Sequence, residues 1–437
     1  MRRSLSLAGL ELTSFDSTEV GYGIVGVCGI DHGLVTLIRS LRIRNVPRVL
    51  VVASSSSVLS SGDVWRLLHA GAADVVEWSD DEDANQIVAK VNRYREVESA
   101  VMEAVANEQM AGVSPAWREL VRRVVEAGRF SSAPVLLTGE SGTGKEHLAR
   151  LVHSAVSRKL TGPERPQLIT VDCTTIVPEL SGSELFGHEK GAFTGAHAVR
   201  EGAFALANHG TLFLDEVGEL SLSLQAQLLR AIQEKTYKRV GGNIWLRTDF
   251  RLVCATNRDL PELVRSGYFR LDLYHRIAGW VFRTLRIEER REDILPLTRY
   301  FLSAIFPGEE IEINPAVCEY LMNRAYPGNI RELRQLIERI AHRHAGSGPI
   351  TVGDIPEDDR PAEGAVLLAW PDQKLERTIA DAIALGASLK EISSATTATA
   401  IRIAVQSERG NLQRAAKRLG VTDRALQMRR AAGMIPE

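Results

Sequence analysis

Few cysteines and almost no net charge set the first limits on this chain. Its 437 residues include four cysteines, and 53 basic residues face 55 acidic ones. The cysteines are scattered, at Cys28, Cys173, Cys254 and Cys318. This spacing excludes the paired pattern of a zinc site, and we expect reduced thiols rather than a disulfide framework. The charge balance excludes a polybasic or strongly acidic chain, so local clusters of charge matter more than the total.

Long apolar runs are also missing. No stretch approaches the roughly 18 consecutive apolar residues that mark a membrane-spanning helix. The first residues are basic, but Glu11 and Asp16 interrupt any apolar core of a signal peptide. We therefore expect a protein without a membrane partner that works in the cytoplasm. Its length predicts about three domains.

Residues 1–106 have the pattern of a small α/β domain. Two short apolar runs rich in β-branched residues, 23–29 and 48–54, predict strands that are buried on both faces. Residues 34–42 between them have helical spacing. Residues 64–78 indicate a helix, a glycine turn and a further strand.

The central part, residues 111–345, also alternates strands and helices, which predicts a parallel sheet with helices on both faces. Four apolar segments are the expected strands: 134–140, 166–172, 211–217 and 250–257. Residues 346–395 are expected to form a linker. Residues 396–437 are helical in pattern and rich in arginine. The predicted fold class is α/β with an additional small α/β domain and a terminal helical domain.

A glycine-rich loop at the end of the first of these strands carries the clearest chemical signal. Its residues are Gly139, Glu140, Ser141, Gly142, Thr143, Gly144, Lys145 and Glu146. Such a loop between a strand and a helix turns backbone N–H groups toward phosphate oxygens, and Lys145 adds a positive charge. Most loops of this kind place Ser or Thr on magnesium where Glu146 stands, so magnesium should depend more on other ligands.

A pair of carboxylates, Asp215 and Glu216, ends another of the predicted strands. Ligands of parallel sheets bind at the carboxyl ends of the strands, so this pair should face the phosphate loop. We expect Asp215 to hold magnesium, partly through water, and Glu216 to polarise the attacking water. A solvated acidic turn is the alternative interpretation.

Phosphoryl transfer also needs positive charge at the γ-phosphate. Arg270 and Arg276 are six residues apart, which keeps both near one edge of a subunit. Neither is close in sequence to the glycine-rich loop, so we expect delivery from a neighbouring subunit. Two surface arginines on a helix are the alternative.

Five motifs in this order resemble the bacterial enhancer-binding proteins of the NtrC type. They are GESGTGKE (139–146), ELFGHEKGAFTGA (184–196), GTLFLDEVGEL (210–220), ATNRDL (255–260) and PGNIREL (327–333). That family consists of AAA+ ATPases that activate transcription by sigma-54 RNA polymerase. The resemblance implies an AAA+ fold with a helical lid, ATP and Mg²⁺ as cofactors, upstream double-stranded DNA as a partner, and a homo-oligomeric ring of six or seven subunits.

The resemblance also implies roles for individual residues. Thr256 and Asn257 match γ-phosphate sensors, Arg270 and Arg276 match arginine fingers, and Arg331 matches a second sensor in the lid. The sigma-54-contacting loop corresponds to Gly191, Ala192, Phe193, Thr194, Gly195 and Ala196. Its flanking glycines allow a tight turn, which we expect to expose the Phe193 ring and the Thr194 hydroxyl.

Asp172 departs from the family pattern, which usually has Asn at this catalytic position. The family's Asn restrains the catalytic glutamate until the target is engaged. An ionised Asp accepts hydrogen bonds but cannot donate them, and it would repel Glu216. We hypothesise that target binding and hydrolysis are coupled differently in this protein.

Residues 410–433 indicate a helix, a turn at 419–421 and a second helix from Thr422, as in a helix-turn-helix. This end resembles the Fis-type DNA-binding domain of the same family. The residues expected to face DNA are Arg414, Lys417, Arg418, Arg424, Gln427, Met428, Arg429 and Arg430. A basic helical hairpin for oligomerisation is the alternative.

The N-terminal domain resembles the second half of a two-component receiver, in truncated and degenerate form. Cys28 occupies the place of the phosphorylated Asp, with Asp31 three residues later, and Trp78 that of the receiver Lys. We expect a domain that makes protein contacts rather than one that accepts phosphate.

Together these features predict an ATP-driven activator that binds upstream DNA and remodels the sigma-54 polymerase. One alternative is an AAA+ remodeller of another protein with a helical adaptor, and the GAFTGA motif argues against it. A small-molecule kinase is a third possibility, and the arginines expected to act between subunits argue against that.

Overall fold

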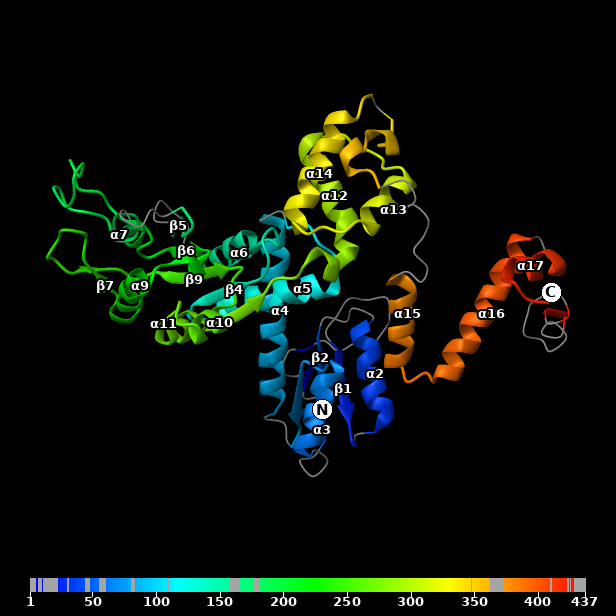
Figure 1. The fold of residues 1–437 in the computed structure, drawn as a ribbon. Coiled ribbons are helices and arrows are strands. Elements are labelled where there is room, and N and C mark those ends of the chain that lie inside the picture. The colour runs from blue at the N-terminus through cyan, green and yellow to red at the C-terminus, as the bar shows by residue number, and fades with distance from the viewer. Residues whose placement is uncertain are drawn as a thin grey trace. The chain divides into compact units, whose positions relative to one another are not determined.

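The computed structural model describes residues 5–6, 10, 23–29, 31–43, 48–54, 60–79, 83–107, 110–157, 166–175, 181–346, 348–361, 373–408, 411–422, 424 and 426–427. The chain divides into two compact units, Met1–Pro356 and Glu357–Glu437. Figure 1 traces both units in chain order. The first unit holds two parallel sheets and a group of helices, and the second is helical.

The N-terminal sheet has three parallel strands in the order β1-β2-β3. All residues of β2 are buried, as expected for a strand covered on both faces. Its elements are β1 (Gly23–Val27), α2 (His32–Ile43), β2 (Val49–Ala53), α3 (Ser61–Ala70) and β3 (Asp74–Glu77). The predicted glycine turn lies after α3, where Gly71 has φ 116°, a value that favours glycine.

A long helix, α4 (Asp83–Asn107), connects this sheet to the rest of the unit. It contacts α5 (Pro115–Phe130) through ion pairs between Arg122 and Glu98 at 3.2 Å and between Arg129 and Glu96 at 3.4 Å. Arg48, just before β2, reaches Glu126 of α5 at 2.9 Å. Charged contacts of this kind therefore join the N-terminal sheet to the first helix of the central domain.

The central sheet has five parallel strands in the order β10-β4-β9-β6-β5. They are β4 (Val135–Thr138), β5 (Leu168–Asp172), β6 (Thr211–Asp215), β9 (Arg251–Thr256) and β10 (Trp280–Arg283). Four of these strands lie within the segments predicted from the sequence. The fifth, β10, was not predicted, because it is a short edge strand whose Trp280 and Val281 side chains are exposed.

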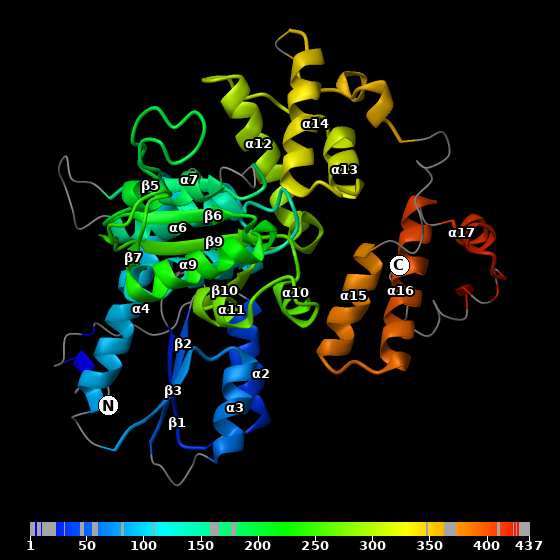
Figure 2. The same cartoon turned by 60° about the vertical axis from the view of Figure 1, so that its left-hand side comes forward.

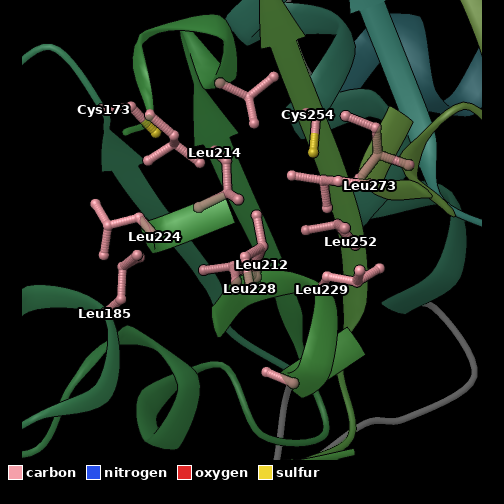
Figure 3. Packing of buried hydrophobic residues seen from close by; sticks show 14 of the residues in the cluster. Cys173, Leu185, Leu212, Leu214, Leu224, Leu228, Leu229, Leu252, Cys254 and Leu273 are labelled. Carbon is pink, nitrogen blue, oxygen red and sulfur yellow. The ribbon is translucent and has the colours of Figure 1, made fainter. Parts of the chain in front are cut away.

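Alternate residues of the central strands pack into two cores on opposite faces of the sheet. Leu212 and Leu214 of β6 enter the core that contains Leu228 of α9 (Leu222–Glu234), shown in Figure 3. Phe213 points into the other core, with α5 and α6 (Lys145–Ser157). This alternation is the period-2 pattern of a strand that is buried on both faces.

Short elements complete the central domain. They are α7 (Ser181–Phe186), α8 (Ala203–Leu206), η2 (Val217–Glu219), β7 (Thr236–Tyr237), β8 (Leu246–Arg247), α10 (Leu260–Arg265) and α11 (Leu271–Ile277). The strands β7 and β8 pair in antiparallel fashion.

A group of helices with its own apolar core follows the central sheet, and Figure 2 shows α12, α13 and α14 gathered together. Its elements are η3 (Ile287–Asp293), α12 (Ile294–Ile305), α13 (Pro315–Asn323), α14 (Asn329–Arg343) and η4 (Val352–Asp354). One side of α14 faces this core, since Leu333, Ile337 and Ile340 are buried and Ile330 packs partly against them. We call this group the lid.

The second unit contains η5 (Glu357–Asp359), α15 (Gln373–Ala384), α16 (Leu389–Ser407) and α17 (Leu412–Leu419). Thus α15 and the start of α16 fall inside residues 346–395, where a linker was expected. Ser388 and Glu391 form a capping box that begins α16, a start signal that the sequence analysis did not use. Packing against α17 comes from Ile401 and Ala404 of α16.

A turn follows α17, which corresponds to the first helix of the expected helix-turn-helix, and most of the expected second helix lies outside the described residues. Asn411 caps the start of α17, and Gly420, with φ 65°, ends it. Ala415, Ala416 and Leu426 are buried. Val421, within the turn, is 44% exposed.

All four cysteines are free thiols. Cys173 and Cys254 are buried, and burial raises the pKa of Cys173 to about 12. Cys28 is exposed and Cys318 is half-buried. Among the described residues, no helix has both the length and the apolar character needed to cross a membrane.

Two leucines of α9 differ in solvent exposure and allow a test of the core. Leu228 is fully buried, whereas Leu222 on the same helix is 49% exposed. We expect Leu228→Ala to lower the free energy of unfolding by about 2–5 kcal/mol, because it removes apolar contacts and leaves a cavity. Leu222→Ala should change it by less than about 0.5 kcal/mol. Urea unfolding followed by circular dichroism measures both, and equal losses would contradict the assignment of this core.

Candidate functional site

The glycine-rich loop lies between β4 and α6, as the sequence predicts. Gly139, Gly142 and Gly144 have φ values of 143°, 74° and 99°, a range that glycine adopts without strain. Successive N–H groups in such a turn form a concave nest that binds phosphate oxygens, and the start of α6 adds its positive dipole end. Glu146 is exposed and pairs with Arg150 at 2.8 Å, in the first turn of α6.

Lys145 lies inside this loop and is 7% exposed. Its ammonium group donates to the carbonyl oxygens of Gly139 at 2.8 Å and Glu140 at 3.3 Å, and it lies 3.4 Å from Glu216 Oε1. A single buried cation therefore joins the glycine-rich loop to the carboxylate pair, which brings together the two motifs predicted from the sequence.

Asp215 lies at the end of β6 and is paired in register with Asp172 at the end of β5. Burial raises the pKa of the Asp215 carboxyl, the negative charge of Glu216 raises it further, and Lys145 opposes both. Oxygen ligands of this kind suit a hard divalent cation, which would offset the unfavourable negative charge. The described ranges contain no group of three or more His, Cys, Asp or Glu side chains placed to hold a metal ion.

The backbone of Glu216 is strained, with φ 52° and ψ 50° in a residue other than glycine. Such a conformation costs on the order of 1–3 kcal/mol and is common at functional sites. The side chain is held from two directions, because Oε2 accepts a hydrogen bond of 2.9 Å from the backbone N–H of Asn257 and Oε1 faces Lys145. Asn257, a predicted sensor residue, thus contacts the predicted catalytic carboxylate directly.

Asp172 is exposed and engaged locally. Its Oδ1 accepts hydrogen bonds from the backbone N–H of Thr174 at 2.9 Å and from the Thr174 hydroxyl at 2.6 Å. Its negative charge is one cause of the raised pKa of Asp215. The described contacts of the Glu216 side chain are with Lys145 and Asn257, not with Asp172.

Thr256, the last residue of β9, contacts the glycine-rich loop. Its carbonyl accepts from the Gly139 N–H at 3.2 Å, and its buried hydroxyl accepts from the Arg258 N–H at 3.1 Å. Across the site, Arg331 of α14 donates to the Ser141 hydroxyl at 2.7 Å. Both predicted sensors therefore touch the phosphate-binding region, one from the sheet and one from the lid.

The two candidate arginine fingers are exposed and lie at the two ends of α11. Arg270 forms a two-pronged ion pair with Asp272, at 3.0 and 2.7 Å. The backbone N–H of Arg270 donates to Gln225 Oε1 at 2.8 Å. Sequence reasoning missed Gln225, a fully buried polar residue within the apolar stripe of α9 that also binds Leu220 O and Tyr268 O.

The GAFTGA loop, residues 191–196, is a tight turn closed by a hydrogen bond of 2.8 Å from the Gly191 N–H to Ala196 O. Gly191 and Gly195 have φ values of 83° and 102°, as expected for the two flanking glycines. Thr194 is exposed, but Phe193 is half-buried and packs edge-on against His188 with ring centroids 4.9 Å apart. The expectation that both side chains project freely is correct for Thr194 only.

The β7–β8 hairpin supports this loop, a contact the sequence analysis did not predict. Arg239 pairs with Glu189 at 3.0 Å, and the Glu189 N–H donates to Val240 O at 3.0 Å. Gly241 approaches Ala192 so closely that an added Cβ would lie 2.8 Å from the Ala192 Cβ. The loop and the hairpin therefore form one connected element.

Comparisons with known proteins agree with this geometry. Residues 110–282 match the sigma-54 interaction domain, and residues 288–365 match an AAA+ ATPase lid domain. The chain is 38% identical to the transcriptional regulatory protein ZraR of Klebsiella oxytoca over 390 residues, which cover 86% of this chain and 81% of that protein. The chain belongs to the sigma-54-dependent transcriptional regulators. It is an AAA+ ATPase that binds ATP.

Other known proteins are similar to this regulator in sequence or in fold. Regulatory protein AtoC of Escherichia coli (strain K12) is 39% identical over 320 residues, 72% of this chain and 65% of that protein. The crystal structure of NtrX from Brucella abortus in complex with ADP has a TM-score of 0.52 at 23% identity, covering 94% of this chain and 89% of that one. This likeness concerns the fold.

The N-terminal residues of this regulator that correspond to receiver positions have structural contacts. Asp31 Oδ1 accepts a hydrogen bond of 2.7 Å from the Leu34 N–H and so caps the start of α2. Trp78 packs partly against the core under the sheet, and Cys28 is exposed. A helix cap explains Asp31 without a phosphoryl group.

Five of the expected DNA-facing side chains of the regulator are described, and all are exposed: Arg414, Lys417, Arg418, Arg424 and Gln427. Arg418 also reaches Glu408 at 3.2 Å and the Ser407 hydroxyl at 3.3 Å. Met428, Arg429 and Arg430 lie outside the described residues.

The raised pKa of Asp215 predicts a pH-dependent cost of its charge. A carboxyl whose folded pKa lies above its ordinary value of 3.8 destabilises the fold as the pH rises above 3.8, and this effect is complete once the pH exceeds the folded pKa. We expect Asp215→Asn to raise the melting temperature at pH 7 in the absence of nucleotide, and this gain should disappear as the pH falls toward 3.8. Thermal melts across this range measure it, and a gain independent of pH would contradict the electrostatic origin.

Proposed function

We propose that this regulator converts ATP hydrolysis into movement of the GAFTGA loop and thereby remodels sigma-54 RNA polymerase at promoters in the cytoplasm. The observation that carries the proposal is the continuous path within one domain from the phosphate loop to an exposed Thr194. Lys145 of the phosphate loop contacts Glu216, and Glu216 contacts Asn257, directly after β9. Glu189, just before the GAFTGA loop, pairs with Arg239 in the β7–β8 hairpin, which precedes β9. A movement at the nucleotide can therefore reach the loop through packed and hydrogen-bonded elements.

In this proposal the residues of the nucleotide site have distinct tasks. The N–H groups of residues 139–146 and the ammonium of Lys145 bind the phosphates of ATP. Asp215 holds Mg²⁺, which when bound neutralises phosphate charge. Glu216 accepts a proton from the attacking water and is oriented by the Asn257 N–H, while Thr256 and Arg331 register the γ-phosphate from the sheet and the lid.

We further propose a ring of six or seven subunits in which Arg270 and Arg276 serve the neighbouring subunit. Both side chains are exposed at the ends of one short helix, and Gln225 fixes the backbone at Arg270. The Asp272 carboxylate keeps the Arg270 guanidinium directed and charged until a more negative phosphate competes for it.

The C-terminal unit supplies the link to DNA in this proposal. Its α17 and Arg424 present basic side chains on the exposed surface, and apolar positions of α17 pack against α16. Arg414, Lys417 and Arg418, joined by Arg429 and Arg430, are assigned to phosphates, and Arg424 and Gln427 to base edges. The N-terminal sheet is proposed as a degenerate receiver-like domain that makes protein contacts.

A promoter-melting assay tests the proposal. Wild-type protein with ATP and sigma-54 polymerase should form open complexes on a sigma-54 promoter. Thr194→Ala should abolish melting while ATPase activity remains, because Thr194 is exposed and lies away from the nucleotide contacts. Glu216→Gln should lose both activities but still bind ATP, since only the proton acceptor is altered.

Melting by Thr194→Ala at the wild-type level would reject the loop as the contact with the polymerase. ATP hydrolysis without melting by the wild-type protein would indicate either another target or a brake, that is, inhibition by the N-terminal domain. Deleting residues 1–106 in the same assay distinguishes these two, since melting should appear on deletion if the N-terminal domain is a brake.

Asp172 gives a separate prediction on coupling. Asp172→Asn introduces an amide donor near Glu216, so we expect basal hydrolysis to fall about fivefold, the effect of one hydrogen bond of about 1 kcal/mol. Stimulation by sigma-54 should rise in the same variant, because the restraint is released on engagement. Steady-state ATPase assays with and without sigma-54 measure both, and unchanged values in both would reject the hypothesis.

A further inference from the structure

Three consecutive carbonyl groups of the glycine-rich loop each accept a hydrogen bond from the lid. Ser141 O accepts from Asn329 Nδ2 at 3.1 Å, and Gly142 O accepts from the Ile330 N–H at 3.0 Å. Thr143 O accepts from Arg290 Nη2 at 3.0 Å. Two separate lid elements, η3 and the start of α14, therefore hold the outer side of the loop.

Asn329 is buried in this contact with a backbone conformation that is uncommon outside glycine. It is 1% exposed and has φ 53°, one of four residues other than glycine with positive φ among those described. Its side chain is fully used: Nδ2 donates to Ser141 O and to Glu140 Oε2 at 3.2 Å, and Oδ1 accepts from the Ile287 N–H at 3.0 Å. A positive φ is uncommon outside glycine, and Asn is among the residue types that adopt it most readily, so this position suits Asn.

Arg290 is a buried cation that also binds a carbonyl of the glycine-rich loop. Its side chain is 1% exposed, its guanidinium lies 4.2 Å from the ring centroid of Trp117, and Asp293 is 3.9 Å away. Burial lowers its pKa to about 10, so the group stays charged at neutral pH. Asp293 in turn accepts from Val113 N–H, Ser114 N–H and the Ser114 hydroxyl, which fixes the start of α5.

The planarity of the peptide group gives these bonds a consequence for phosphate binding. In a trans peptide the carbonyl of one residue and the N–H of the next point in opposite directions. Fixing the carbonyls of residues 141, 142 and 143 therefore directs the N–H groups of Gly142, Thr143 and Gly144 away from the lid donors. Those N–H groups belong to the loop that binds phosphate oxygens.

We propose that Asn329 and Arg290 are positioning residues that orient the phosphate-binding N–H groups from behind, by holding the outward carbonyls of the loop. The position of the lid then sets the affinity of the loop for phosphate. In the reverse direction, phosphate binding that rotates these peptide groups pulls on η3 and α14. Neither side chain needs to touch the nucleotide for this role.

The test compares three variants with a matched control. Asn329→Asp keeps the shape and the acceptor for Ile287 but loses the amide donor, and Arg290→Met keeps an apolar contact with Trp117 but loses the donor to Thr143 O. Arg290→Lys keeps the charge. The control is Arg334→Gln, an exposed residue of α14 paired with Glu338.

We expect Asn329→Asp and Arg290→Met each to raise the Kd of ATP and ADP about tenfold, as expected for loss of one hydrogen bond that holds the site. KM for ATP should rise with them, whereas kcat should change less, and Arg290→Lys should recover part of the affinity. The affinity for adenosine, measured by competition, should be unchanged because it has no phosphate. Arg334→Gln should leave all these values at wild-type levels.

Two results would overturn the proposal. If kcat falls in proportion to the folded fraction seen by circular dichroism while KM and Kd stay constant, both residues act on stability alone. If the affinity for adenosine falls as much as that for ADP, the variants disturb the whole pocket and do not act through the phosphate-binding N–H groups.

Discussion

The parallel register of β4, β9, β6 and β5 is the constraint on which the rest of this protein depends. Thr138 pairs with Thr256, and Asp172 pairs with Asp215, so that four strands end along one edge of the sheet. The glycine-rich loop follows β4 and the carboxylate pair follows β6, and their meeting at Lys145 is a result of this register. A slip of one residue would turn Leu212 and Leu214 to the opposite face and separate the site.

The lid contacts this edge of the sheet through the glycine-rich loop. Its own apolar core keeps η3, α12, α13 and α14 together, and its polar contacts with the loop are concentrated at Arg290, Asn329, Ile330 and Arg331. Apolar packing supplies rigidity within the lid, and directional hydrogen bonds supply its connection to the loop. An element that is rigid inside and joined by few bonds can move as a body.

Two acidic residues show how one residue type takes opposite roles by context. Asp215 lies half-buried beside Glu216, and its charge is unfavourable until a cation offsets it. Asp293 is fully buried, but three hydrogen bonds and a nearby guanidinium compensate its charge. The first arrangement suits ligand binding, and the second suits a permanent structural connection.

The sequence by itself determined the phosphate-binding chemistry and four of the five strands of the central sheet. The GESGTGKE loop, the Asp215–Glu216 pair and the apolar runs around them are local patterns, and the phosphate loop must follow a strand whatever its surroundings. Tertiary structure decided the rest: that Asn257 contacts Glu216, that Phe193 rests on His188, that Gln225 holds Arg270, and that Arg290 and Asn329 reach the loop. These contacts join residues 5 to 189 positions apart, and no local periodicity records which distant backbone group a side chain will meet.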